Sequence, residues 1–179
     1  MRRIVESTLV SLDGVFESPQ VWATEYFDRE AEKLALDLLL ASDAMLMGRK
    51  TFEFFAAAFP HQTGDYGRRI NEMQKYVFSN SLKKADWTHS SIVAGDVAAE
   101  AAKLKQQDGK DLVIYGHGVL AQTLLERRLL DELKLWIHPL FVGRGKQLSR
   151  DGSTTKMKLK ATKTLGTGVV VLTYQPARA

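Results

Sequence analysis

The stretch from Asp111 to Gly145 constrains the fold of this chain more than any other. It opens with the apolar run Leu112 to Tyr115, which ends at two closely spaced glycines, Gly116 and Gly118. Apolar residues at helical spacing follow, and a second apolar run extends from Leu133 to His138. This order predicts a strand, a tight turn, a helix and another strand, with backbone N–H groups exposed at the helix start. Because helix starts bind anions, we interpret the turn as a site for the diphosphate of a dinucleotide.

The rest of the chain alternates strand and helix patterns in the same way. Apolar and β-branched runs predict strands at residues 4–12, 44–47, 76–78 and 91–94. Helical spacing predicts helices from near Asp28, from Phe52 to Pro60 and from an N-cap at Asp96. The polar segment 61–74 indicates mainly a loop, with at most a short helical stretch. A chain of 179 residues that is 45% hydrophobic suits one buried core, so we predict a single α/β domain over residues 1–179.

A lysine-rich segment lies near the C-terminus. Residues 154–164 alternate lysines with Met157, Leu159 and Ala161, which predicts a strand with one solvated face. A glycine-containing turn leads into a last predicted strand at 169–174, so the two strands should form an antiparallel hairpin that closes one edge of the sheet. The lysines have no interleaved exposed aromatics, which favours a solvated edge over a nucleic-acid interface. We therefore expect no nucleic-acid partner.

Composition excludes several other classes of protein. The absence of cysteine rules out disulfides, a thiol nucleophile and a Cys-ligated zinc, and the four histidines lack metal spacing, so we expect no metal. The net charge of +4 is mild and would suit an anionic small ligand. No stretch approaches ~18 consecutive apolar residues, and Glu6 and Asp13 interrupt the N-terminal run. We expect no membrane span, no signal peptide and a cytoplasmic location.

Three predicted strand ends carry turns that favour anions. They are Gly48-Arg49-Lys50-Thr51, Ser79-Asn80-Ser81 and Gly116-His117-Gly118. In open α/β sheets, ligands lie outside the carboxyl ends of the strands, so these turns should face one ligand. Two helix starts and the hydroxyl of Thr51 could neutralise a diphosphate. Arg49 and two nearby lysines would leave positive charge for the additional phosphate of NADP, so we expect NADPH rather than NADH.

Each turn also has a simpler interpretation, because glycines occur at strand-to-helix junctions in every α/β fold for geometric reasons. The Gly48 turn is not a Walker A loop, since no glycine precedes the Gly-Lys-Thr pattern at the required spacing. The Gly116 turn fits a short Rossmann fingerprint, but it comes late in the chain. The acid expected at the end of the following strand is missing, because that strand ends at His138-Pro139. These departures count against both a kinase and a standard Rossmann dehydrogenase.

Five segments together resemble the dihydrofolate-reductase superfamily. They are SLDG (Ser11 to Gly14), DAMLMGRKTFE (Asp43 to Glu53), KYVFSNSL (Lys75 to Leu82), LVIYGHGVLAQTLL (Leu112 to Leu125) and LLDELKLWIHPLFVGRGKQL (Leu129 to Leu148). More narrowly, they resemble stand-alone proteins similar to the C-terminal reductase domain of the riboflavin-biosynthesis enzyme. The resemblance implies a three-layer fold with a mostly parallel sheet and antiparallel C-terminal strands. It also implies NADPH as cofactor and a homodimer, formed through the sheet edge or the Leu112–Pro139 unit.

The resemblance further implies roles for the three turns. Gly48, Arg49 and Thr51, with Lys50 beside them, would hold the cofactor phosphates, and Arg49 would lie near the additional one. Ser79, Asn80 and Ser81 would lie along the adenosine. The diphosphate and the nicotinamide ribose would be wrapped by Gly116, His117, Gly118, Val119 and Leu120. His117 departs from the family pattern, because dihydrofolate reductase has no large side chain between these glycines. Its imidazole must point outward or touch the ligand, and a surface histidine is the favoured interpretation.

The implied reaction is hydride transfer to a small nitrogen heterocycle. The substrate would be a pyrimidine like 5-amino-6-(5-phosphoribosylamino)uracil, or a compound like a pterin or folate, with a link to riboflavin biosynthesis. Asp13 and Glu32 are the candidate catalytic acids, although a turn-forming aspartate and a solvated helix glutamate are simpler interpretations. Trp22, Tyr26 and Phe27 could stack on the heterocycle or belong to the core. The alternative function is an NADP-binding module with weak or no turnover.

Overall fold

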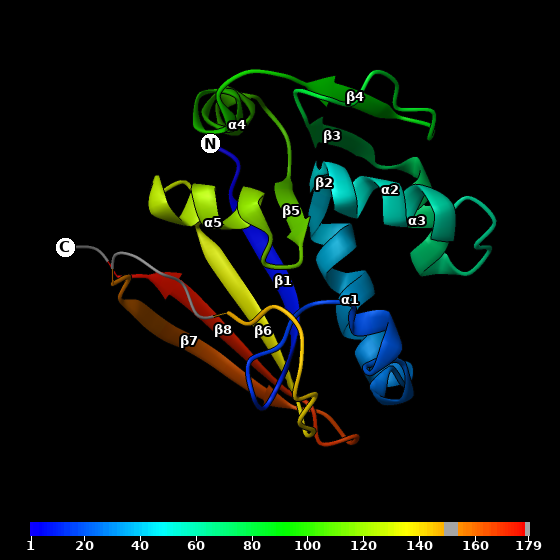
Figure 1. Ribbon diagram of the computed structural model, residues 1–179, viewed down its shortest axis with the longest axis vertical. Helices are drawn as coiled ribbons and strands as arrows, with labels where there is room; N and C mark the ends of the chain where they lie inside the picture. Colours follow the sequence, from blue (N-terminus) through cyan, green and yellow to red (C-terminus); the bar gives the residue numbers. More distant parts are fainter. Residues whose placement is uncertain (149–153, 178–179) are drawn as a thin grey trace.

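The computed structural model describes residues 1–148 and 154–177, which form one eight-stranded sheet between two layers of helices (Figure 1). The strands are β1 (Ile4–Ser11), β2 (Ser42–Gly48), β3 (Gln74–Phe78), β4 (Ser90–Val93), β5 (Asp111–Tyr115), β6 (Glu132–His138), β7 (Met157–Thr164) and β8 (Val170–Pro176). Their order across the sheet is β4-β3-β2-β5-β1-β6-β8-β7. Neighbours pair in parallel, except that β8 is antiparallel to both β6 and β7. The predicted mostly parallel sheet with an antiparallel C-terminal end is confirmed.

Helices cover both faces of this sheet. They are α1 (Arg29–Ala41), α2 (Arg49–Ala58), α3 (Asp65–Glu72), α4 (Val97–Gln106) and α5 (Val119–Glu126), with 3-10 turns η1 (Pro19–Val21) and η2 (Thr24–Tyr26) before α1. Apolar residues of α4 and α5 pack on one face around Leu46 and Ile114. On the other face, α1, α2 and α3 pack around Met45 and Val113. None of the helices in the described part of the chain is long and apolar enough to cross a bilayer.

Two aspartates start helices as their positions in the sequence suggest. The side chain of Asp28 accepts a hydrogen bond from the backbone N–H of Ala31 at the start of α1. Asp96 accepts one from Ala99 at the start of α4, which confirms it as an N-cap. By contrast, α2 begins at Arg49, earlier than the predicted Phe52. The helix therefore starts directly after Gly48, and its free N–H groups belong to the first of the three anion-friendly turns.

The segment 61–74 differs from the prediction of mainly a loop, because most of it forms α3. Its two glycines predict a loop, yet Gly67 lies within α3 and allows the helix to pack closely against Gln62. A Cβ atom at Gly67 would lie 2.4 Å from Cβ of Gln62, so a larger residue would push the preceding loop away. Ile70 of the same helix is completely buried in the core. Tertiary packing thus overrides the polar composition of this segment.

The C-terminal hairpin of β7 and β8 is confirmed, and β7 is the terminal strand of the sheet. The prediction that only one face of this strand is solvated is wrong. Leu159 is 49% exposed and Ala161 is also exposed, although both were expected on the covered face. The pairing register with β8 shifts between these two residues, which breaks the simple alternation. The strand lies at the outer edge of the sheet, away from the helices (Figure 1).

A buried lysine joins α3 to the loop that precedes β4. The ammonium of Lys75 donates to the backbone carbonyls of Asn71, Met73 and Thr88 at 2.7, 2.8 and 3.1 Å. It also lies 4.3 Å from the centroid of the Trp87 ring. Burial lowers the pKa of Lys75 to about 8.

Replacing this lysine tests its contribution to stability. In Lys75→Met three buried carbonyls lose their donor, so we expect the free energy of unfolding at pH 7 to fall by about 1–3 kcal/mol. Between pH 8 and 10.5 the unfolded chain holds more of this proton than the folded chain, so the wild type should gain stability that the variant does not. Urea denaturation across this pH range measures both effects. Lys158→Met on exposed β7 is the control and should change stability by less than about 0.5 kcal/mol.

Candidate functional site

The three predicted turns lie side by side at one edge of the sheet. They follow β3, β2 and β5, which are adjacent in the order of strands and parallel to one another. Parallel strands end at the same edge, so the turns meet even though they are far apart in the sequence. In Figure 1 the starts of α2 and α5 both lie at this edge. The sequence prediction that the three turns could contact one ligand is therefore geometrically possible.

Both helices at this edge begin with an open backbone. Their N-caps are Gly48 for α2 and Gly118 for α5, which have no side chain to accept hydrogen bonds from the N–H groups of the first turn. An added Cβ at either glycine would meet no atom of residues 1–148 and 154–177 within 4 Å, chain neighbours aside, so these residues leave the space beside each turn open. Each helix start carries about half a positive charge on its free N–H groups. Two such starts close together suit the diphosphate of a dinucleotide.

Arg49 connects the first turn to the second. Its Nη1 donates to the hydroxyl of Ser81 at 3.1 Å, and its Nε donates to the carboxylate of Glu53 at 2.6 Å. The side chain is half exposed, and these contacts use only two of its five N–H donors. Hydrogen bonds hold the second turn in place. Ser79 Oγ accepts from Leu82 N at 3.0 Å, and Asn80 Oδ1 accepts from Gly95 N at 2.9 Å. The guanidinium of Arg49, which contacts this hydrogen-bonded turn, could therefore meet the additional phosphate of NADP.

The third turn contains the residue that departs from the family pattern, and its side chain is buried. His117 is 4% exposed, so its interpretation as a surface histidine is wrong. Nδ1 of the imidazole lies 2.8 Å from Oε1 of Glu6, a completely buried carboxylate on β1. The hydroxyl of Thr8 donates to the same oxygen at 2.7 Å, and the ring of Phe16 makes an edge contact with the imidazole. The side chain turns inward, which leaves the backbone of Gly116 and Gly118 available to a ligand.

Sequence reasoning missed the role of Glu6. In the sequence, this residue stands out only as an interruption of the first apolar run. A charged residue in the middle of a buried strand is itself a signal, because a buried carboxylate needs a partner. The identity of that partner depends on the pairing of β1 with β5, in which Ser7 lies opposite Tyr115 and thus close to the His117 turn.

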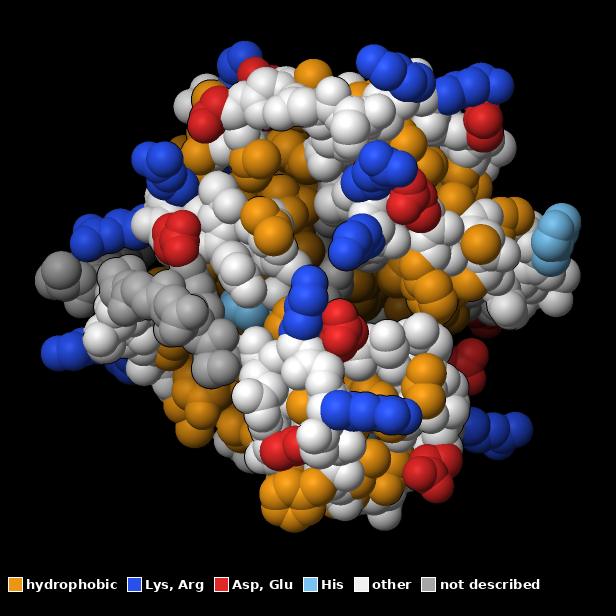
Figure 2. Space-filling model, viewed as in Figure 1, with side chains coloured by type: hydrophobic (Ala, Val, Ile, Leu, Met, Phe, Trp, Pro, Cys, Tyr) orange, Lys and Arg blue, Asp and Glu red, His pale blue; other side chains and the backbone are white. Residues whose placement is uncertain are grey.

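A second group that sequence reasoning missed is an aromatic cluster beside the same edge. Phe55 stacks on Tyr115 with ring centroids 5.8 Å apart and on Phe59 at 4.8 Å. Tyr66 lies 6.1 Å from Phe59 and 6.4 Å from Phe27. We call these five residues the aromatic cluster. Figure 2 shows the molecule hollowed near the centre of this view, with hydrophobic side chains inside the hollow and Lys and Arg side chains around it.

The two tyrosines of the aromatic cluster bring polar groups into it. Burial raises the pKa of Tyr66 to about 12 and raises the pKa of Tyr115 well above its ordinary value. The hydroxyl of Tyr115 is buried, and its interaction with the hydroxyl of Tyr66 adds to the rise in its pKa. Both phenols therefore stay neutral near pH 7.

Of the aromatics predicted to stack on a substrate, Trp22 and Tyr26 contact a buried histidine. Their rings lie 5.3 and 5.6 Å from the ring of His138 in edge contacts. The indole N–H of Trp22 donates a hydrogen bond to the backbone carbonyl of Glu17 at 3.0 Å. Burial lowers the pKa of His138, so its imidazole is neutral at pH 7. Phe27 differs from the other two, because it is 40% exposed and joins the aromatic cluster.

Comparison with known families agrees with this geometry. The sequence profile of the RibD C-terminal domain matches residues 2–171. The chain belongs to the RibD C-terminal domain family. Two Bacillus subtilis (strain 168) proteins with uncharacterized functions are similar to it along nearly their whole length. YyaP is 30% identical over 97% of this chain and 94% of its own, and YwjB is 27% identical over 94% and 95%.

Solved structures share the fold of this RibD C-terminal domain. A Shewanella sp. PV-4 protein named for riboflavin biosynthesis has a TM-score of 0.78 at 19% identity, covering 98% of this chain and 99% of its own. A pyrimidine reductase-like protein from Corynebacterium diphtheriae has a TM-score of 0.69 at 13% identity, covering 99% and 93%. The deaminase/5-amino-6-(5-phosphoribosylamino)uracil reductase of Thermotoga maritima has a TM-score of 0.66 at 13% identity, covering 98% of this chain and 57% of its own. Reductases are thus among the proteins that share this fold.

The two candidate acids of this RibD C-terminal domain lie in different settings. Ser11 Oγ donates to Asp13 at 2.5 Å, and the backbone N–H groups of Gly143 and Val142 donate at 2.7 and 3.1 Å. These hydrogen bonds lower the pKa of Asp13 to about 2, which makes it a poor proton donor near neutral pH. Asp13 instead attaches the loop after β6 to the loop after β1. Glu32 is exposed on the first turn of α1.

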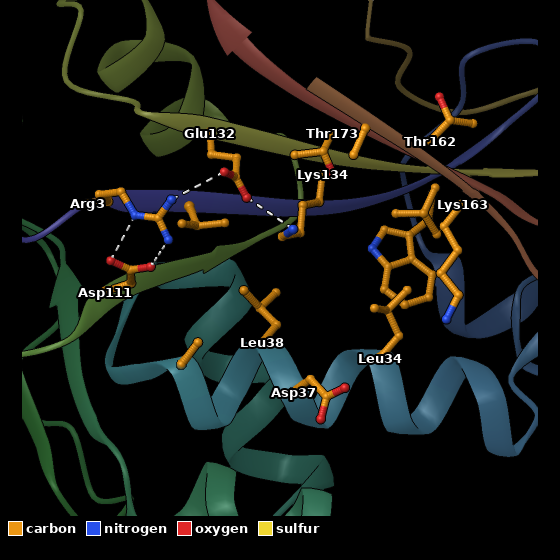
Figure 3. A pocket seen from close by; sticks show the side chains of 15 residues that line it. Arg3, Leu34, Asp37, Leu38, Asp111, Glu132, Lys134, Thr162, Lys163 and Thr173 are labelled. Carbon is orange, nitrogen blue, oxygen red and sulfur yellow. Dashed lines mark hydrogen bonds and ion pairs between the residues drawn. The ribbon is translucent and has the colours of Figure 1, made fainter. Parts of the chain in front are cut away.

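A separate cavity of about 340 Å³ lies between α1 and the sheet (Figure 3). Its apolar lining comes from Leu34, Leu38, Val5, Trp136 and Val171. Arg3 at one end is paired with Asp111 and lies 3.4 Å from Glu132, which in turn lies 3.0 Å from Lys134. These residues belong to the starts of β1, β5 and β6, at the opposite edge from the turns. Because the charges neutralise one another, the cavity is a poor site for an anionic dinucleotide.

The contacts of Asp13 predict a structural effect that can be measured. In Asp13→Ala the N–H groups of Val142 and Gly143 lose their acceptor, so we expect their hydrogen exchange to accelerate by about tenfold or more. In the wild type, protonation between pH 3.8 and about 2 should weaken the same attachment, since the folded form has the lower pKa. Exchange followed by mass spectrometry or NMR measures this. Asp65→Ala, at an exposed aspartate paired with Arg68 on α3, should leave these two amides unchanged.

Proposed function

We propose that this chain is an NADPH-dependent reductase that transfers a hydride to a small, flat nitrogen heterocycle. The observation that carries the proposal is the meeting of three turns and two uncapped helix starts at the ends of β3, β2 and β5. Membership of the RibD C-terminal domain family supports a reductase of the riboflavin-pathway type. Bound NADPH would supply the hydride. The chain's own residues would hold the cofactor, orient the acceptor and exclude water from the reacting faces.

The arrangement of cations favours NADPH over NADH. The half-exposed Arg49 belongs to the first turn, contacts Ser81 of the second turn and Glu53, and retains free N–H donors. Lys50 beside it is exposed. A guanidinium and an ammonium at this position would meet the additional phosphate on the adenosine ribose. The start of α2 would hold one part of the diphosphate, with the hydroxyl of Thr51 close by, and the start of α5 would hold the other.

The aromatic cluster is the proposed site for the substrate. A flat heterocycle could stack against its partly exposed rings, of which Phe27 is 40% exposed. A pyrimidine similar to 5-amino-6-(5-phosphoribosylamino)uracil is the first substrate class to test, because the Thermotoga maritima enzyme named as its reductase shares the fold. Pterins and folates are the second class.

A second candidate function is an NADP-binding module with weak or no turnover. The observation in its favour is the setting of the candidate acids, since Asp13 holds a loop with a pKa of about 2 and Glu32 is exposed to solvent. The proton that accompanies hydride transfer would then have to come from water. A module of this kind would bind NADPH as tightly as a reductase but would oxidise it slowly or not at all.

Titration with NADPH and NADH, followed by nicotinamide fluorescence, tests both functions. We expect NADPH to bind with at least about tenfold higher affinity than NADH. Oxidation of bound NADPH is then measured with aminouracils, pterins and folates. Oxidation by one of these compounds supports the reductase, binding without oxidation supports the binding module, and failure to bind either nucleotide contradicts both.

A substitution at Arg49 tests the preference for NADPH directly. In Arg49→Ala we expect the affinity for NADPH to fall by about tenfold, because a charge-assisted contact with the additional phosphate is lost. The affinity for NADH should fall by less than about threefold, since that nucleotide lacks the phosphate. Arg68→Ala removes another exposed, ion-paired arginine, on α3, and is the control. Equal losses for both nucleotides in Arg49→Ala would contradict the proposed contact.

A further inference from the structure

The buried pair of Glu6 and His117 has a geometry that the phosphate site alone does not require. The third turn is anchored to β1 by the backbone hydrogen bond from Gly116 N to Ser7 O, at 3.0 Å. Its central residue then sends its side chain back over β1 on the α5 side of the sheet, where it meets Glu6. A residue between two glycines at an open turn could as easily point into the ligand space. Something must therefore hold the imidazole inside.

The contacts of Glu6 explain how the imidazole is held. Oε1 of the carboxylate accepts from both Thr8 and His117, whereas Oε2 is buried and has no partner among the described residues. A completely buried carboxylate is costly unless it is paired, so Glu6 depends on the imidazole as much as the imidazole depends on Glu6. If either side chain rotated away alone, the other would stay buried without this hydrogen bond. The pair thus resists outward rotation of the His117 side chain.

We propose that Glu6 is a positioning residue that keeps the imidazole of His117 out of the diphosphate space. With the side chain held inward, the turn offers its backbone N–H groups to the phosphates as a pair of adjacent glycines would. Without Glu6 the imidazole would lose its buried acceptor, and rotation toward solvent would place it over Gly116 and Gly118. This inference rests on the proposed binding of NADPH at that turn.

A set of variants tests the inference by the affinity for NADPH, measured by fluorescence titration, with thermal unfolding followed in parallel. Glu6→Ala should weaken binding by about tenfold or more. Glu6→Gln keeps an oxygen that can accept from Nδ1 and should weaken binding by less than about threefold. The double variant E6A/H117G lacks the obstructing ring, so it should bind NADPH at least about fivefold more tightly than Glu6→Ala alone.

The control distinguishes positioning from general destabilisation. Glu132→Ala removes another largely buried strand glutamate, at the opposite edge of the sheet, and should lower the melting temperature while NADPH affinity stays within about twofold. If Glu6→Ala does not fold, Glu6→Leu replaces it in the single and double variants. A double variant that binds no more tightly than the single one overturns the inference while leaving the proposed function intact. A wild type that does not bind NADPH overturns both.

Discussion

Parallel pairing of β3, β2 and β5 is the constraint on which the site depends. Each strand in this group ends at the same edge, so residues near positions 48, 80 and 117 become neighbours without any direct sequence relation. The helices that return the chain start at this edge with glycine N-caps, which concentrates unpaired N–H groups there. The candidate cofactor site is therefore a product of strand order and strand direction, and individual side chains refine it.

Charge is distributed unequally between the two edges of the sheet. At the edge where the parallel strands begin, cations are neutralised in place, as Arg2 is by Asp43, Arg3 by Asp111 and Lys105 by Asp131. At the opposite edge Arg49 is paired as well, with Glu53, but the starts of α2 and α5 remain open. The positive charge offered to an anionic ligand at this edge therefore comes largely from the open helix starts.

Much of this arrangement could be predicted from the sequence, because it rests on local patterns. Apolar runs predict the positions of the strands, and Asp96 predicts the start of α4. The glycine turns predict the edge of the sheet at which a dinucleotide would bind. The failures lie where distant contacts decide the structure. The polar segment around Gly67 became a helix because Ile70 packs into the core against distant strands, and His117 became buried because the pairing of β1 with β5 places Glu6 beneath it. The aromatic cluster was missed for the same reason, since Phe55, Tyr66 and Tyr115 come from three separate elements.

The exposed terminal strand β7 has a consequence for how copies of this chain can associate. Its outer backbone edge is a potential template for another strand, yet Lys158 and Lys160 stand exposed along it. Two copies that extended their sheets edge to edge through β7 would bring these ammonium groups together. Such a joint sheet would depend on ionic strength, because only screening by salt would reduce the repulsion. In dilute buffer, the lysines should therefore oppose pairing of two copies through β7.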